Sequence, residues 1–120
     1  MLRNFALHDE NLEDKQVGTF SYNTETKQFS MTLDATIPLS DLPLTLEGFA
    51  YRKLFSLSHE EVLRFIRGRI CPPGRHNIRE ILADNDLPEY DEFGLLMITM
   101  ARCGKDGLYL IENTEASKRI

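Results

Sequence analysis

The strongest constraint on how this chain can fold is a change in the spacing of its apolar residues near the middle of the sequence. In the run 28–33, Phe29, Met31 and Leu33 alternate with polar residues, and this period of two places one apolar face on a strand. From about residue 59 the apolar residues instead recur every three or four positions, as on a helix. The chain is therefore predicted to be α+β, with an N-terminal hairpin or small antiparallel sheet, three short helices and a C-terminal strand.

The first half is expected to contain a β-hairpin. The run 16–22 places Phe20 and Tyr22 on one face, and the polar residues 23–27 form a turn that leads into the strand 28–33.

Two prolines lie in the segment that follows the hairpin. Pro38 and Pro43 lie in the apolar run 37–44, where they exclude a central strand or a helix interior. An ordered, apolar-lined loop or an edge strand is expected there, and residues 44–51 are expected to form a further short strand.

The first predicted helix begins at a capping box. Ser58 and Glu61 have the spacing at which each side chain can satisfy an unpaired backbone N–H of the other residue. An apolar stripe follows and the run 71–74 ends the helix, because proline cannot continue it. The stripe consists of Val62, Leu63, Phe65, Ile66 and Ile70.

Two more helices and a strand complete the prediction. A second helix runs to about Asn85 and is expected to point Ile78, Ile81 and Leu82 inward. A third helix spans 92–103, with Asp91 as its cap, Gly104 as its stop and an apolar face that supplies much of the core. A last strand is expected over 108–111.

Length and composition favour a single domain over residues 1–120. The chain has 120 residues and a formal net charge of −5, which argues against a general coat for nucleic acid. Residues 1–15 and 113–120 are expected to be poorly ordered ends. No apolar run is long enough for a secretion signal or a membrane helix, so a cytoplasmic location and no membrane partner are expected. Cys71 and Cys103 are expected to be reduced.

The sequence contains no recognisable catalytic constellation. His8, His59 and His76 have no nucleophile or orienting partner at a diagnostic spacing. Cys71 and Cys103 do not form a zinc-binding pair, and no glycine-rich phosphate loop is present. We therefore expect no enzymatic activity, no cofactor and no metal.

One charge asymmetry remains. Residues 52–79 hold seven Lys and Arg residues and only two acidic ones, in a chain that is acidic as a whole. Arginine binds carboxylates and phosphates through two parallel hydrogen bonds. The candidate partner-binding residues lie around the rigid turn in this segment, and they are Arg64, Arg67, Arg69, Pro72, Pro73, Arg75, His76 and Arg79.

Three interpretations of this segment stay open. The arginines can form a solvated helix face that pairs with the acidic remainder of the domain, which would leave a small domain of unknown function with no active site. They can form a protein-binding surface, because arginine is enriched at interfaces. As a further alternative, the helix, Pro-Pro-Gly turn and second helix can act as a helix-turn-helix-like DNA-binding regulator.

Residues 44–112 resemble a segment of HipA-like serine/threonine kinases. The resemblance rests on the run 57–61, on Arg69 with Pro72-Pro73 and Arg75, and on the runs 77–82 and 90–96, closed by Asp106 before Tyr109. In that family the segment is a subdomain ahead of the kinase core, and toxin–antitoxin operons encode it in some cases as a separate small protein. The resemblance implies an antitoxin-like regulator or companion subunit of a HipA-like kinase. The ATP and metal residues of the kinase lie outside the matched segment.

Overall fold

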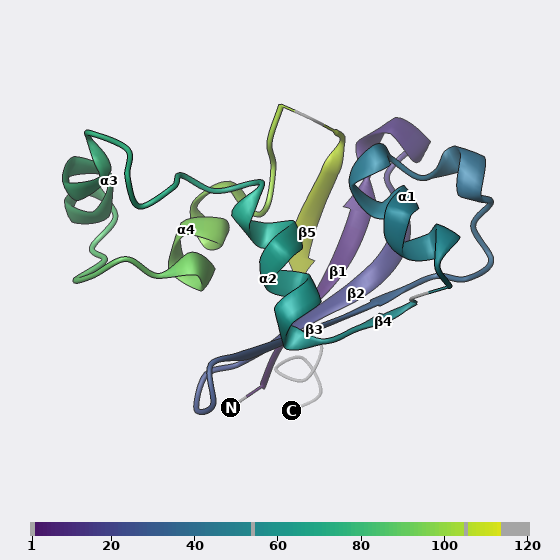
Figure 1. Cartoon of the computed structure of the whole chain (residues 1–120), viewed down its shortest axis with the longest axis horizontal. Coiled ribbons are helices and arrows are strands. Elements are labelled where there is room, and N and C mark those ends of the chain that lie inside the picture. The colour runs from purple at the N-terminus through teal and green to yellow at the C-terminus, as the bar shows by residue number, and fades with distance from the viewer. Residues whose placement is uncertain (1, 54, 105, 114–120) are drawn as a thin grey trace.

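One layer of the protein is a five-stranded antiparallel sheet in the order β4-β3-β2-β1-β5 (Figure 1). The structure is a computed structural model, and it describes residues 2–53, 55–104 and 106–113, apart from the side chains of residues 39, 44 and 45. The strands are β1 (Leu2–Asp9), β2 (Lys15–Asn23), β3 (Gln28–Leu33), β4 (Ser56–Leu57) and β5 (Leu108–Glu112).

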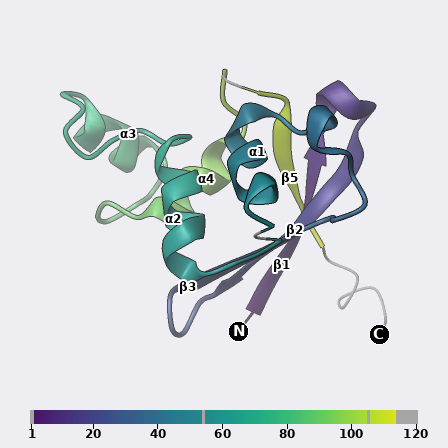
Figure 2. The same cartoon turned by 45° about the vertical axis from the view of Figure 1, so that its right-hand side comes forward.

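The second layer consists of helices that pack on one face of the sheet. Figures 1 and 2 show α1 and α2 on this side, whereas α3 lies away from the sheet. Three helices contribute buried side chains to the core, while no residue of α3 is buried. The helices are α1 (Leu44–Tyr51), α2 (His59–Arg67), α3 (Ile78–Asp84) and α4 (Glu92–Thr99).

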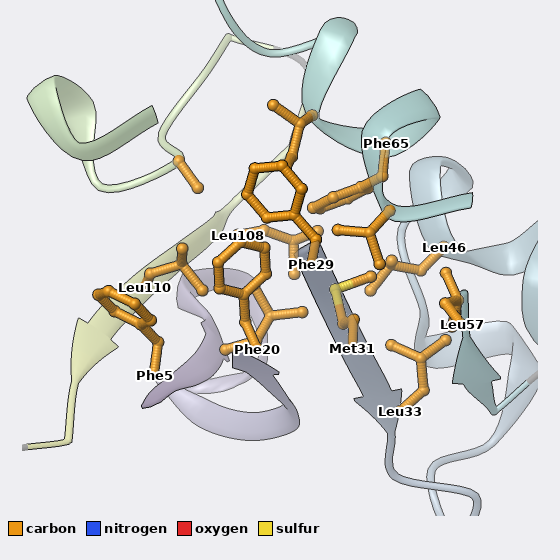
Figure 3. Close-up of a cluster of buried hydrophobic side chains, with 14 of the residues drawn as sticks. Phe5, Phe20, Phe29, Met31, Leu33, Leu46, Leu57, Phe65, Leu108 and Leu110 are labelled. Carbon is orange, nitrogen blue, oxygen red and sulfur yellow. The ribbon is translucent and has the colours of Figure 1, made fainter. Parts of the chain in front are cut away.

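The core lies between the sheet and these helices, and Figure 3 shows part of it. Along β3 buried and exposed residues alternate strictly, as the period of two requires. Phe93 of α4 stacks on Tyr22 of β2 with ring centroids 4.0 Å apart, and it meets Phe5 of β1 edge to face at 6.1 Å. These aromatic contacts hold α4 against the middle of the sheet.

The α+β class, the hairpin and the capping box are confirmed. The hairpin consists of β2 and β3, which pair from Gly18 with Leu33 to Asn23 with Gln28. Ser58 and Glu61 exchange both capping contacts. The Glu61 carboxylate accepts hydrogen bonds from the backbone N–H and the hydroxyl of Ser58, and these lower the pKa of Glu61 because they favour its charged form. The predicted last strand is also present as β5.

Two predictions about the first half are wrong. Residues 44–51 form helix α1 and not a strand, and Pro43 precedes its first turn, where proline costs a helix nothing. Residues 2–9 are not a poorly ordered end, because β1 pairs with β2 on one side and β5 on the other. Residues 37–43 form a loop with a short 3-10 helix at Leu39–Asp41, and Leu44 begins α1. The expectation for the C-terminal end falls on residues 114–120, which lie outside the described residues.

The helices of the second half are shorter than predicted. α2 ends at Arg67, before the prolines, with Gly68 as its C-cap. Asp91 caps α4 as predicted by accepting a hydrogen bond from the Phe93 backbone N–H, but α4 ends at Thr99 and not at Cys103. Met100 terminates it in a left-handed conformation with φ of 52°.

Gly18 lies beside a β-bulge, since Leu7 pairs with Gly18 while the next residue of β1, His8, pairs with Gln16. A Cβ at position 18 would overlap the carbonyl oxygen of Thr32 in β3. We expect Gly18→Ala to destabilise the protein by about 1–3 kcal/mol, because neighbouring backbone must shift to admit the methyl group. Chemical denaturation measures this change.

Gly48 in α1 provides the matched control. A Cβ there meets nothing within 4 Å, so Gly48→Ala should stabilise the protein by roughly 0.5–1 kcal/mol through the helix preference of alanine. Equal stabilities for the two variants would contradict the close approach of the Thr32 carbonyl to Gly18.

Candidate docking surface

Arg69 follows α2 and is buried in the body of the protein, with 7% of its surface exposed. Its guanidinium binds the Asp106 carboxylate through two hydrogen bonds, with Nη1–Oδ2 and Nη2–Oδ1 distances of 2.9 and 2.6 Å. Its Nε also donates to the Ala101 carbonyl at 2.7 Å. The prediction that Arg69 contacts a partner is wrong, since this guanidinium is enclosed and bonded within the chain.

The ion pair joins three parts of the fold. Arg69 lies at the end of α2, Ala101 follows α4, and Asp106 comes shortly before β5. Asp106 also accepts a hydrogen bond from the backbone N–H of Leu108, the first residue of β5. Charges that are paired and fully hydrogen-bonded in this way tolerate burial, whereas either charge alone would not.

Residues 71–91 form a lobe that projects from the rest of the fold, which we call the body. The lobe begins after α2 and ends at α4 (Figures 1 and 2). The Tyr90 hydroxyl donates to the Cys71 carbonyl at 2.7 Å, which joins the two ends of the lobe. Burial raises the pKa of Tyr90, because it disfavours the phenolate. The hydroxyl therefore remains protonated, and able to donate, throughout the neutral pH range.

Helix α3 lies within this lobe and has no fully buried side chain. Ile78, Ile81 and Leu82 are each only half-buried, so the prediction that they point into the core is wrong. The lobe touches α4 through Leu87, since a Cβ at Gly94 would lie 2.7 Å from Leu87 Cδ2. An apolar helix face thus lies at the surface, although the sequence pattern alone resembles that of a core helix.

The other candidate residues are exposed at two places. Arg64 and Arg67 lie on α2, where Arg67 approaches Glu92 with an Nη2–Oε2 distance of 3.5 Å. That pair is exposed, so it contributes little to stability. Five further candidates lie in the lobe, and they are Pro72, Pro73, Arg75, His76 and Arg79.

The turn before α3 is held by local hydrogen bonds. Arg75 Nε donates to Asn77 Oδ1 at 2.8 Å, and the Arg75 backbone N–H donates to the Pro72 carbonyl at 3.2 Å. The two prolines restrict the backbone further. The structure therefore presents the lobe arginines on a segment with few conformations available to it.

A cleft of about 340 Å³ lies between the tip of the hairpin, α2 and the end of the lobe. His59 lines it, but its Nδ1 accepts the Phe29 backbone N–H at 3.0 Å and its ring stacks on that of Phe29. His59 therefore holds β3 against α2. Local sequence patterns could not reveal this structural role, because Phe29 is 30 residues away along the chain.

The described residues contain neither a metal-binding cluster nor a membrane-spanning helix. No group of three or more His, Cys, Asp or Glu residues in the described ranges is placed to hold a metal ion. No helix within those ranges is long and apolar enough to cross a membrane.

In comparisons with protein-family models, curated proteins and solved structures, nothing matched this chain. The resemblance to HipA-like kinases therefore stays a prediction.

Arg69 allows a direct test of the buried ion pair. We expect Arg69→Met to destabilise the protein by about 3–5 kcal/mol, because it leaves the Asp106 carboxylate buried without its counter-charge. Arg67→Met is the matched control, and it should change stability by at most about 1 kcal/mol because the Arg67–Glu92 pair is exposed.

Chemical denaturation of both variants measures the difference. Removing both charges in Arg69→Met/Asp106→Asn should cost less than the sum of the two single changes, since the charges are coupled. Additive losses would contradict the coupling.

Proposed function

We propose that this protein is a non-enzymatic docking subunit that binds a protein partner through the lobe 71–91. The partner would offer an acidic surface beside an apolar groove. In line with the sequence resemblance, we propose a HipA-like kinase as this partner and an antitoxin-like regulatory role for the complex.

The observation that carries the proposal is the incomplete burial of α3. A seven-residue helix is too short to be stable on its own, and most helices gain their stability by packing an apolar face. In α3 that face, made of Ile78, Ile81 and Leu82, remains partly exposed to water. A partner that covers it would remove this apolar surface from water at about 25 cal/mol per Å².

Charge restricts where an acidic partner can bind. Residues 71–91 hold two basic residues against five acidic ones, so an acidic surface would contact the turn before α3 and not the lobe as a whole. Arg75 and Arg79 are exposed beside this apolar face, and neither is enclosed by the body as Arg69 is. Aromatic residues and arginine are enriched at protein interfaces, and exposed cations speed the encounter with an acidic surface.

The composition of α3 favours a protein over nucleic acid. Between Ile78 and Asp84 the helix carries one basic residue, Arg79, against the two acidic residues Glu80 and Asp84. A recognition helix in the major groove would bring these carboxylates close to phosphates, which opposes binding.

Co-expression with a kinase-like product of a neighbouring gene tests this proposal. The double variant Arg75→Glu/Arg79→Glu should bind this kinase at least about tenfold more weakly, which corresponds to roughly 1.4 kcal/mol. Binding of the wild type should also weaken as salt is added, since the steering charges are screened.

Arg52→Glu/Lys53→Glu is the matched control. It reverses two exposed charges of the same basic segment outside the lobe, so its affinity should equal that of the wild type. Equal losses in the two double variants would refute docking through the lobe. Failure of the wild type to capture the kinase would remove the proposed partner.

A further inference from the structure

The sheet has a second face that the helices leave open. The residues whose side chains bury against the helices alternate along each strand, so the intervening residues point to the opposite side. The pairing register places one set of residues on this open face, which consists of Leu2, Asn4, Ala6, His8, Gln16, Thr19, Ser21, Asn23, Gln28, Ser30, Thr32, Ser56, Tyr109 and Ile111.

The strands contribute no Asp, Glu, Lys or Arg to the open face, although such residues make up 28% of the chain. Charged side chains border it: the Tyr109 hydroxyl donates to Asp14, Arg102 lies over the Tyr109 ring at 4.3 Å, and Asp34 lines the hollow beside Thr19 and Thr32. The centre of the face carries hydroxyl and carboxamide groups, and one side carries apolar residues. Leu2 is 54% exposed and Ile111 48% exposed on that side. A solvated sheet face would be expected to share in the charge of the surface, whereas the centres of protein interfaces are depleted of charged residues.

The chemistry of this face makes it complementary to itself. Hydroxyl and carboxamide groups both donate and accept hydrogen bonds, so a surface built from them can pair with an identical surface. Thr19 lies in β2, the middle strand of the sheet, and Thr32 is its neighbour in β3. The same face on a second copy therefore offers each of these groups a partner.

The net charge of the chain also bears on whether a second copy can pack against the open face. The chain carries a net charge of −5, so two copies repel each other over most of their surfaces. The strands of the open face add no charge of their own to a contact between two copies, and the charged side chains Asp14, Asp34 and Arg102 lie at its edges.

The size of the face fits a weak dimer. Five strands about 4.8 Å apart and about six residues long cover a patch of roughly 20 by 20 Å. Face-to-face packing would bury on the order of 1,000 Å² over both copies, the lower limit of a specific interface.

We propose that in solution the open face of the sheet packs against the same face of a second copy, forming a symmetric sheet-on-sheet dimer. Because the helices lie on the other side of each sheet, both lobes point away from this interface. The dimer would then present two docking lobes at once.

Thr19 supplies the test, because it lies near the centre of the face and thus near the two-fold axis of such a dimer. The wild type should have twice the 13.8 kDa monomer mass by sedimentation at high concentration. Thr19→Lys and Thr19→Glu should each be monomeric with an unchanged circular dichroism spectrum, since each variant brings two like charges together.

An equimolar mixture of Thr19→Lys and Thr19→Glu should regain the dimer mass, because opposite charges then meet across the axis. This rescue separates interface loss from misfolding. Ser40→Glu is the matched control, since Ser40 is exposed outside the sheet and should leave the dimer intact.

A monomeric wild type between roughly 10 and 200 µM would overturn the proposal, as would dimers that persist in both Thr19 variants. If the wild type is monomeric and Thr19→Lys instead abolishes capture of the co-expressed kinase, the face belongs to that partner and not to a second copy. Loss of kinase binding in the lobe variant alone would leave the dimer proposal unaffected, so the two proposals fail separately.

Discussion

The arrangement of the second half of the chain depends on the buried ion pair between Arg69 and Asp106. Four hydrogen bonds from the guanidinium of Arg69, just after α2, connect it to Ala101, two residues after α4, and to Asp106 and Leu108 at the start of β5. The stacking of Arg69 over the Phe65 ring, at 4.8 Å, encloses the pair further. These contacts hold in place the two points between which the lobe 71–91 leaves and rejoins the body.

The helix face of the sheet, the lobe and the open sheet face differ in their capacity to bind another protein. The helix face of the sheet is filled by the core, so it has no capacity for a partner. The lobe lacks full burial of its apolar helix face, and the strand residues of the open sheet face carry no charge. Because these two surfaces come from opposite sides of the sheet layer, one can bind a different protein while the other binds a copy of this chain.

Local patterns predicted the hairpin and the capping box, since both depend on residues close together in the sequence. β1 was missed because its alternating apolar signal is short: of its inward-facing positions only Phe5 and Leu7 are apolar, and the other two are Arg3 and Asp9. The burial of Arg69 was missed because its counter-ion is 37 residues away. The position of α3 was missed because periodicity identifies an apolar face but does not reveal whether anything covers it.

Native-state hydrogen exchange tests this account most directly. In this account the lobe is incompletely packed, whereas the Arg69–Asp106 pair makes α2 and β5 unfold together with the rest of the fold. The account predicts that amides of α3 exchange through local opening, at a free energy well below that of global unfolding. Amides at the end of α2 and in β5, which the Arg69–Asp106 pair connects, should exchange only when the whole protein unfolds. Protection of α3 equal to that of β5 would contradict the account.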